Sequence, residues 1–226
     1  MAARPSMGKT AIAMNFAQNV GEKGKNVAVF SLEMSKEQLT DRMIAASMAV
    51  DSWKLQKGKL SEDDFAKMGD ALERLSRAKI YIDDSPAGAG ILELKSKARR
   101  LKMESGLDLI VIDYLQLISS GNSFNRVQEV SEISRGLKSL ARELNVPVIA
   151  LSQLSRALEA RPDKRPIMSD LRESGAIEQD ADIILMLYRD DYYNDMSETP
   201  NVTNIFIRKN RNGPTGQVDL KFEKQH

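Results

Sequence analysis

The sequence predicts an α/β fold with a mainly parallel, twisted β-sheet flanked by helices. Short apolar runs rich in β-branched residues alternate with longer stretches of helical period, and this alternation is typical of repeated strand and helix units. The last two apolar runs are joined by a turn that contains glycine and proline, which predicts an antiparallel hairpin. We therefore expect a single domain over residues 1–226 that ends in a β-hairpin.

Seven segments have the composition expected of strands. In chain order they are Val27–Leu32, Lys79–Asp83, Leu109–Asp113, Val146–Ser152, Ile183–Tyr188, Thr203–Lys209 and Gln217–Phe222. The first five are expected to form the parallel part of the sheet, and the last two the hairpin.

Helix signals lie between these strands. Ser35 is followed by Gln38 in the spacing of a capping box, and acidic residues follow Ser61 in the first turn of another helix. A stripe of apolar residues at a spacing of three and four predicts a core-facing helix. Its members are Val127, Val130, Ile133, Leu137, Leu140, Ala141 and Leu144.

Three charged or polar stretches need an interpretation as well. We interpret the basic run Lys95–Lys102 as the solvated face of a helix whose apolar face meets the core through Leu94, Ala98 and Leu101. The polar stretches Ser119–Arg126 and Asp190–Asn201 have no period and are predicted to be loops.

The composition excludes several classes of function. Lys and Arg number 33 against 32 Asp and Glu, so no overall field attracts a polyanion and any contact with nucleic acid must be local. The chain has no cysteine and its single histidine is His226, which argues against thiol catalysis and histidine-based metal sites. There is no membrane-spanning run and no signal-peptide pattern, so we expect a cytoplasmic protein without membrane contact.

The stretch "ARPSMGKT", Ala3–Thr10, matches the phosphate-binding loop G-x-x-x-x-G-K-[ST] except that Ala3 replaces the first glycine. Gly8 allows close approach of the backbone to phosphate, Lys9 can bridge the β- and γ-phosphates, and the Thr10 hydroxyl can bind Mg²⁺. Only Met1 and Ala2 precede the motif, so the strand that normally leads into it is expected to be missing from the chain.

Polar residues also stand at the carboxyl ends of three predicted strands, where ligands bind in open parallel sheets. They are Glu33, Asp113 and Gln153. Asp113 suits an outer-sphere Mg²⁺ ligand, Glu33 suits polarisation of an attacking water, and the Gln153 amide suits contact with a γ-phosphate. Each of them alone is a common strand-end polar residue. Together with the phosphate loop they predict hydrolysis of a nucleoside triphosphate.

With these residues in place, the chain resembles the RecA-like ATPase domain of bacterial and phage replicative DNA helicases of the DnaB type. The motifs "ARPSMGKTA", "FSLEMS", "LIVIDYLQL", "ALSQLSR", "SDLRESGAIEQDAD" and "KNRNGPTG" occur in the family's order and extend over essentially the whole chain. In this family the alanine at Ala3 is a normal feature of the phosphate loop.

The resemblance implies an ATP- and Mg²⁺-dependent helicase that moves 5′ to 3′ on single-stranded DNA as a homo-hexameric ring. It also implies partners of the full-length protein, namely primase and a helicase loader, and an N-terminal primase-interacting domain that this chain lacks. The nucleotide-binding residues it implies are Ser6, Met7, Gly8, Lys9, Thr10 and Ala11, with Thr10 and Asp113 for the metal. The implied catalytic residues are Lys9, Glu33, Asp113, Gln153, Lys209 and Arg211.

The segment "RESG", Arg172–Gly175, corresponds to a loop of the central channel in this family. Arg172 and the backbone at Glu173 and Gly175 are therefore expected to hold DNA phosphates without sequence specificity. From spacing alone, a helix end with an Arg–Glu pair is the preferred interpretation, and the resemblance favours the DNA contact instead. The loop Ser119–Arg126 is a second candidate for the channel.

The basic hairpin "RKNRNGPTG" leaves two interpretations open. Cations on an edge strand commonly resist aggregation. Phosphoryl transfer, however, often uses an arginine from outside the phosphate loop, and the side chain of Arg4 is expected to face out from the protein. Lys209 and Arg211 are two residues apart on one strand face, and the resemblance implies that they reach the neighbouring subunit's nucleotide.

Two other functions remain compatible with the same residues. One is an ATPase that regulates or loads a helicase without unwinding DNA. The other is a nucleotide-dependent assembly module.

Overall fold

The computed structural model describes residues 1–85, 90–119, 126–171 and 175–225. Its strands are β1 (Ala2–Ala3), β2 (Val27–Ser31), β3 (Ile80–Asp83), β4 (Leu109–Asp113), β5 (Val148–Ala150), β6 (Ser152–Gln153), β7 (Ile183–Tyr188), β8 (Val202–Asn210) and β9 (Gly216–Lys221). Its α-helices are α1 (Lys9–Gly21), α2 (Lys36–Met48), α3 (Ser52–Gln56), α4 (Glu62–Arg77), α5 (Ile91–Glu104), α6 (Arg126–Leu144), α7 (Gly175–Asp180) and α8 (Asp190–Tyr193). Three 3₁₀ turns complete the described elements, η1 (Leu115–Leu117), η2 (Arg156–Ala160) and η3 (Met168–Leu171).

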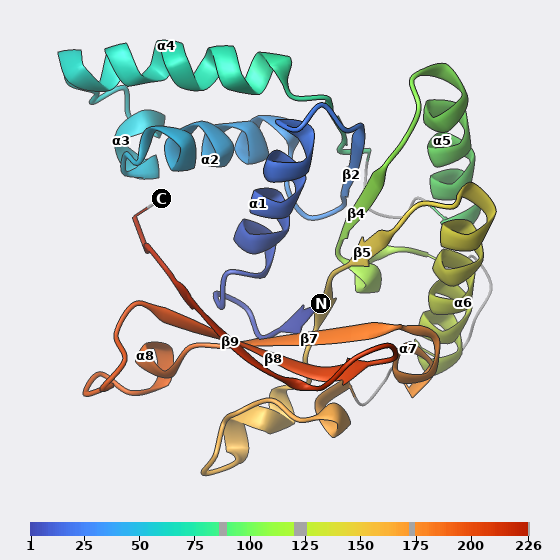
Figure 1. Cartoon of the computed structure of the whole chain (residues 1–226). Helices are drawn as coiled ribbons and strands as arrows, with labels where there is room; N and C mark the ends of the chain where they lie inside the picture. The colour runs from blue at the N-terminus through green and yellow to red at the C-terminus, as the bar shows by residue number, and fades with distance from the viewer. Residues whose placement is uncertain (86–89, 120–125, 172–174, 226) are drawn as a thin grey trace.

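The strands form two sheets that meet where β5 ends and β6 begins. One sheet has the order β3-β2-β4-β5 and is parallel, and the other has the order β6-β1-β7-β8-β9. In the second sheet β1 is parallel to β6 and β7, whereas β7, β8 and β9 are antiparallel. The α/β class, the parallel arrangement of β2 to β5 and the final hairpin are confirmed, whereas β7 lies in the second sheet, antiparallel to β8 (Figure 1).

The predicted strand Val146–Ser152 is divided at Leu151. The Leu151 N–H donates to Ile112 O at 2.9 Å, and the next N–H, that of Ser152, donates to Met1 O at 2.9 Å. The chain therefore changes partner from β4 to β1 within one residue. This change joins the two sheets.

The strand that we expected to be missing before the phosphate loop is present as the two-residue β1. Ala2 pairs with Ser152 and Met186, and Ala3 pairs with Gln153. Two alanines have weak strand propensity, so the sequence pattern did not mark them. Pairing on both sides places them between β6 and β7.

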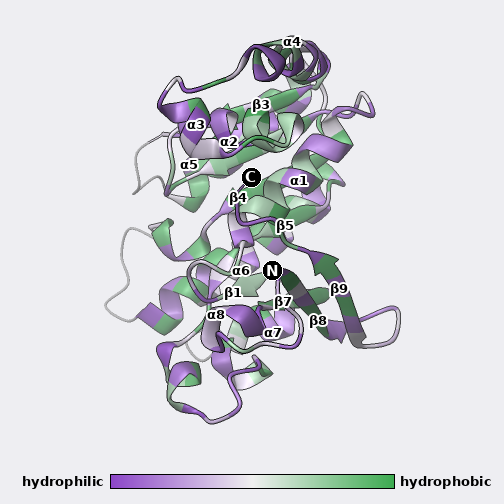
Figure 2. Cartoon of the chain, turned by 90° about the vertical axis from the view of Figure 1, so that its left-hand side faces the viewer, coloured by the Kyte–Doolittle hydropathy of each residue, from purple (hydrophilic) through white to green (hydrophobic). Residues whose placement is uncertain are grey.

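Alternate residues of β2 and β4 pack against helices on opposite faces of the parallel sheet. Phe30 and Ile112 belong to a core with α5 and α6, and Val29 and Val111 to a core with α1 and α2. The helices α3 and α4 pack on α2 through a smaller apolar cluster around Ala71. In Figure 2 the strands are mainly hydrophobic and α4 is mainly hydrophilic, as expected for an outer layer.

The predicted helix signals agree with the structure with two exceptions. Ser35 and Ser61 begin helices with complete capping boxes, and Leu94 and Ala98 of α5 are buried. Val127 is an exception, because its side chain is 47% exposed and the buried part of the stripe begins at Val130. Within the predicted loop 190–201 the structure forms the short helix α8.

Among the described residues, no helix has both the length and the apolar character needed to span a bilayer.

Candidate nucleotide site

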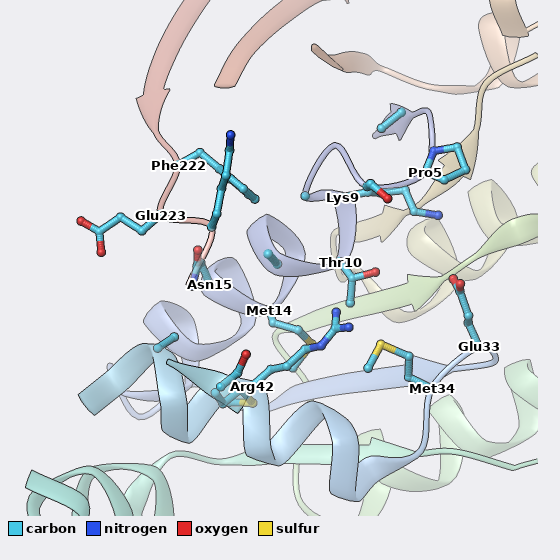
Figure 3. A pocket seen from close by; sticks show the side chains of 18 of the residues that line it. Pro5, Lys9, Thr10, Met14, Asn15, Glu33, Met34, Arg42, Phe222 and Glu223 are labelled. Carbon is cyan, nitrogen blue, oxygen red and sulfur yellow. The ribbon is translucent and has the colours of Figure 1, made fainter. Parts of the chain in front are cut away.

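A cavity of 790 Å³ lies at the carboxyl ends of β1, β2, β4 and β6. Its walls come from the phosphate loop, α1, α2 and the segment that follows β9. The residues with polar side chains that line it are Arg4, Ser6, Lys9, Thr10, Asn15, Gln18, Glu33, Arg42, Ser52, Tyr114, Gln153, Lys221, Glu223 and Lys224. Figure 3 shows Lys9, Thr10 and Glu33 directed into this space.

The phosphate loop has a backbone that suits an anion. Gly8 has φ 87° and precedes α1, and Ser6 also has a positive φ of 64°. The left-handed conformation at Gly8 favours glycine, and a Cβ there would lie 2.7 Å from the Phe222 ring. Within the described part of the chain, no side chain caps the first turn of α1. The amides of this turn can therefore donate to a bound anion.

Lys9 and Thr10 line the cavity, and the buried Asp113 lies behind them. The Thr10 hydroxyl donates to Asp113 Oδ2 at 2.5 Å, and Lys9 Nζ lies 3.5 Å from Asp113 Oδ1 and 4.2 Å from the centroid of the Tyr114 ring. Burial lowers the pKa of Lys9 from its ordinary value, and the carboxylates of Asp113 and Glu33 oppose that shift. The side chains of Lys9 and Asp113 are only 13% and 5% exposed. Their interaction is therefore weakly screened by solvent.

The oxygens of Thr10 and Asp113 are suited to a divalent cation. Asp113 Oδ1 is buried and has no hydrogen-bond partner among the residues that the structure describes. Hydroxyl and carboxylate oxygens are ligands that Mg²⁺ prefers, together with water and phosphate oxygens. Within the described ranges, no group of three or more Asp, Glu or His side chains is arranged so that it could hold a metal ion by itself. The donor set thus fits a cation that is shared with a phosphate ligand.

Glu33 is held at the rim of the cavity by a tight turn after β2. The Ser31 hydroxyl donates to Met34 O at 2.6 Å, and the Leu32 N–H donates to Asp113 O at 2.7 Å. The Glu33 side chain itself is exposed and points toward the Lys9 ammonium (Figure 3). A carboxylate in this position can accept a proton from a water molecule in the cavity.

Gln153 also lines the cavity, and its backbone is held by a residue that the sequence analysis missed. The side-chain amide of Gln116, in η1, donates to Ser152 Oγ at 2.9 Å and to Gln153 O at 3.3 Å. Its oxygen accepts from the Gln153 N–H at 3.2 Å. A glutamine within the apolar run "YLQLI" was the available signal.

Two further residues that the sequence analysis missed, Arg189 and Phe222, form the outer wall. The Arg189 guanidinium lies 3.9 Å from the centroid of the Phe222 ring and donates to Ser6 O at 3.4 Å. Arg189 directly follows β7, so the rule that identified the other strand-end residues also applies to it. Figure 3 shows Phe222 at the other end of the cavity from Glu33.

Asp191 holds this wall in place. Its carboxylate is 3.0 Å from Arg189 and 2.9 Å from Lys224 Nζ, and it accepts from the Asn201 N–H at 3.2 Å. Although burial favours the neutral acid, these donors lower the pKa of Asp191 to about 2. The ionised carboxylate therefore stabilises the folded chain.

Replacing Asp191 by asparagine is expected to lower the free energy of unfolding at pH 7 by about 2 kcal/mol. Because the folded pKa lies below the ordinary value, the contribution is present above about pH 4 and is lost as the pH falls through about 2. Denaturant unfolding at pH 7 and pH 3 measures the difference between wild type and variant, which should shrink by about half. Asp195→Asn, in the exposed part of the same segment, is the matched control and should change little. An equal difference at both pH values would contradict this role.

Lys209 and Arg211 of the basic hairpin lie outside the cavity of their own chain. Lys209 Nζ donates to Glu178 O at 2.6 Å, and the Arg211 guanidinium is 3.0 Å from Asp182 and donates to Gln179 O at 3.3 Å. Both therefore contact the end of α7, on the side that Figure 1 shows away from α1. A hydrogen bond from Lys138 and the charge of Arg211 lower the pKa of Asp182.

Arg4 does not point away from the protein as expected. Its side chain is only 8% exposed, with Nε 2.9 Å from Glu159 and NH1 donating to Leu154 O at 2.9 Å. The carbonyl of Leu154 and the carboxylate of Glu159 compensate for burial of the guanidinium. The guanidinium anchors the phosphate loop to the segment after β6.

The expected DNA contacts fall mostly outside the described residues. Arg172 and Glu173 belong to the undescribed range 172–174, and most of the loop Ser119–Arg126 lies in 120–125. Gly175 is described, is exposed and begins α7.

The fold and the cavity together define a RecA-like, phosphate-loop nucleotide-binding protein. The chain belongs to the DnaB-like helicase C terminal domain family, which matches residues 1–226. It is 60% identical to the Replicative DNA helicase DnaB of Geobacillus stearothermophilus and 59% identical to the Replicative DNA helicase DnaC of Bacillus subtilis (strain 168). Each alignment covers 100% of this chain and 50% of the relative, so the chain spans half the length of these proteins.

Solved structures agree with this assignment. A solved ATPase domain matches with a TM-score of 0.95 and 45% identity, over 99% of this chain and 80% of that one. A structure described as a DnaB-like replicative helicase and its interactions with primase matches with the same score and identity, over 99% of this chain and 54% of the other.

Proposed function

We propose that this chain is the ATP-hydrolysing motor domain of a replicative DNA helicase, which moves 5′ to 3′ along single-stranded DNA and separates the duplex. The observation that carries the proposal is that Lys9, Thr10 and Glu33 line one cavity, with Asp113 bound to Thr10 and Lys9 behind it, in a chain of the DnaB-like family. The names of its relatives, replicative DNA helicases, support the biological role.

In this proposal the loop residues Ser6 to Ala11 and the first turn of α1 hold the triphosphate of ATP. Lys9 neutralises charge on the β- and γ-phosphates. Mg²⁺ would be held by Thr10, by Asp113 through water and by phosphate oxygens, and it supplies positive charge as the γ-phosphoryl group is transferred. Glu33 accepts a proton from the attacking water as the water oxygen bonds to the γ-phosphorus, while the bond between the γ-phosphorus and the ADP oxygen breaks. The products are ADP and inorganic phosphate.

The far end of the cavity suits the nucleobase. Phe222 lines the cavity at the end opposite Glu33, and its aromatic ring is a candidate contact for the base (Figure 3). In this proposal the Gln153 amide, which lines the same cavity, contacts the γ-phosphate.

The assembly belongs to the proposal as well. A homo-hexamer in the cytoplasm would surround DNA phosphates with Arg172, Glu173 and Gly175 of each subunit, and Lys209 and Arg211 would complete the neighbour's site. Primase and a loader would bind the full-length protein, and the primase interactions described for one solved relative support the first of these partners. Contact with phosphates alone makes DNA binding indifferent to sequence and sensitive to salt.

Replacing Glu33 by glutamine tests the catalytic role. The variant is expected to lose about 10²-fold or more in ATP hydrolysis while binding ATP as tightly as wild type, because the amide cannot accept the proton. Steady-state hydrolysis and titration with a fluorescent ATP analogue measure the two properties. Glu37→Gln, an exposed acid in the first turn of α2, is the matched control. Unchanged hydrolysis by Glu33→Gln would rule out Glu33 as the base.

Unwinding of a forked duplex tests the motor role. A fork with a free 5′ tail should be separated faster than one with only a 3′ tail. If a verified hexamer hydrolyses ATP but separates neither fork, the regulator or loader function is favoured.

A further inference from the structure

Gln116 contacts both backbone groups of Gln153, as a neighbouring β-strand would. Its side-chain amide nitrogen donates to Gln153 O, and its oxygen accepts from the Gln153 N–H, at 3.3 and 3.2 Å. A third contact, from the same nitrogen to Ser152 Oγ at 2.9 Å, fixes the orientation of the amide. The side chain therefore replaces a strand on that side of β6.

This replacement is needed because β6 is only two residues long. On one side it pairs with β1, where Ala3 is opposite Gln153 and the Leu154 N–H donates to Ala3 O at 3.0 Å. On the other side the chain has just left β4 at Leu151. Gln116 thus supplies the second support for a strand that β4 no longer holds.

Gln116 is itself fixed to the two elements next to it in the sequence. It lies three residues after Asp113 in η1, and its carbonyl accepts a hydrogen bond from the Arg126 guanidinium at the start of α6. A movement of α6 or of the end of β4 would therefore change the support of Gln153.

We propose that Gln116 is a positioning residue for Gln153, which holds the backbone from which the Gln153 amide contacts the γ-phosphate. This inference rests on the role proposed for Gln153. A displacement of about 1 Å in such a group is enough to cost on the order of 10²-fold in rate. The effect of Gln116 is expressed through Gln153 and not through direct contact with the nucleotide.

The test compares Gln116→Ala, Gln153→Ala and the double variant. For each, titration gives the dissociation constants of ADP and of a non-hydrolysable ATP analogue with Mg²⁺, and their ratio measures discrimination for the γ-phosphate. Hydrolysis is measured with and without single-stranded DNA. We expect each single variant to lower the ratio about tenfold with ADP affinity unchanged, and the double variant to equal Gln153→Ala alone.

Each outcome bears on a different step. If Gln153→Ala leaves the ratio and the hydrolysis unchanged, the proposed role of Gln153 fails. If Gln153→Ala lowers the ratio but Gln116→Ala does not, or if the two effects multiply in the double variant, the positioning role of Gln116 is overturned. Effects that multiply in this way are additive in free energy, and they would mark Gln116 as a general structural residue.

Two further variants protect the test against a folding defect. Ser152→Ala removes one contact of the amide and Gln116→Glu keeps only the acceptor for the Gln153 N–H, so both should give intermediate losses of about threefold. Gln56→Ala, at the exposed end of α3 and outside the cavity lining, is the matched glutamine control. Thermal unfolding of every variant is recorded alongside. If folded Ser152→Ala and Gln116→Glu both retain full discrimination, the proposal is wrong.

Discussion

Replacing Lys9 by alanine is expected to reduce ATP hydrolysis by a factor of about 10³ or more and to weaken binding of the triphosphate more than that of the diphosphate. Lys9 is the single cation that the structure places beside both Thr10 and Asp113 within the described part of the chain. Removal of one preorganised charge from such a site typically costs about 10²–10³ in rate, and Lys9 also neutralises the ground-state phosphates.

The buried position of Lys9 adds a second effect that must be separated from the first. Without the ammonium, the Asp113 carboxylate retains only the Thr10 hydroxyl, so the variant is also expected to be less stable. Hydrolysis rates and nucleotide affinities should be measured well below the unfolding temperature of the variant. Lys23→Ala, exposed just after α1, is the control. If the folded Lys9→Ala protein hydrolyses ATP as wild type does, the assignment of the phosphate site is wrong.

Mixing Arg211→Ala subunits with Lys9→Ala subunits is expected to restore ATP hydrolysis that neither variant performs alone. Arg211 contacts Asp182 and the end of α7, and it is not among the residues that line its own cavity. If it acts on the neighbour, a mixed ring contains sites with an intact phosphate loop from one chain and an intact arginine from the next. At equal proportions and random order, about a quarter of the sites combine both.

The restored rate should therefore approach about a quarter of the wild-type rate and should depend on the mixing ratio, with its maximum near equal proportions. Arg100→Ala is the matched partner control, because Arg100 is exposed on α5 and pairs only with Glu104 among the contacts described. Native mass measurement must first show that the two variants share rings. Mixed rings that remain inactive would indicate that Arg211 serves its own chain or the surface only.

The strand and helix boundaries followed from the sequence wherever a local pattern decides the structure. Leu109–Asp113 and Ile183–Tyr188 were predicted residue for residue, because a short run of β-branched and aliphatic residues that is mostly buried in a sheet has few alternatives. The two-residue strands β1 and β6 were not predicted. They exist through pairing with distant strands and not through their own composition.

The site shows the same division. The residues at strand ends, Glu33, Asp113 and Gln153, could be placed from topology alone. Glu33 and Gln153 line the cavity, and so does Tyr114, the residue after Asp113. Arg4 was placed wrongly, because its partners Leu154 and Glu159 are about 150 residues away in the sequence. The sequence analysis missed Gln116 and Phe222 for the same reason. Their importance depends on which distant backbone they contact, and no spacing in the sequence reports it.

The contacts at the phosphate loop also determine when during synthesis the site can exist. Ser6 accepts from Arg189, and the ring of Phe222 lies against Gly8, so the loop contacts residues that are translated almost at the end of the chain. A nascent chain that has only reached residue 180 has made the phosphate loop, Glu33, Asp113 and Gln153 but lacks β7 beside β1 and the wall behind Gly8. Closing such long loops is slow in folding. Nucleotide binding should therefore appear abruptly as the polypeptide lengthens, and only after Phe222 has been made.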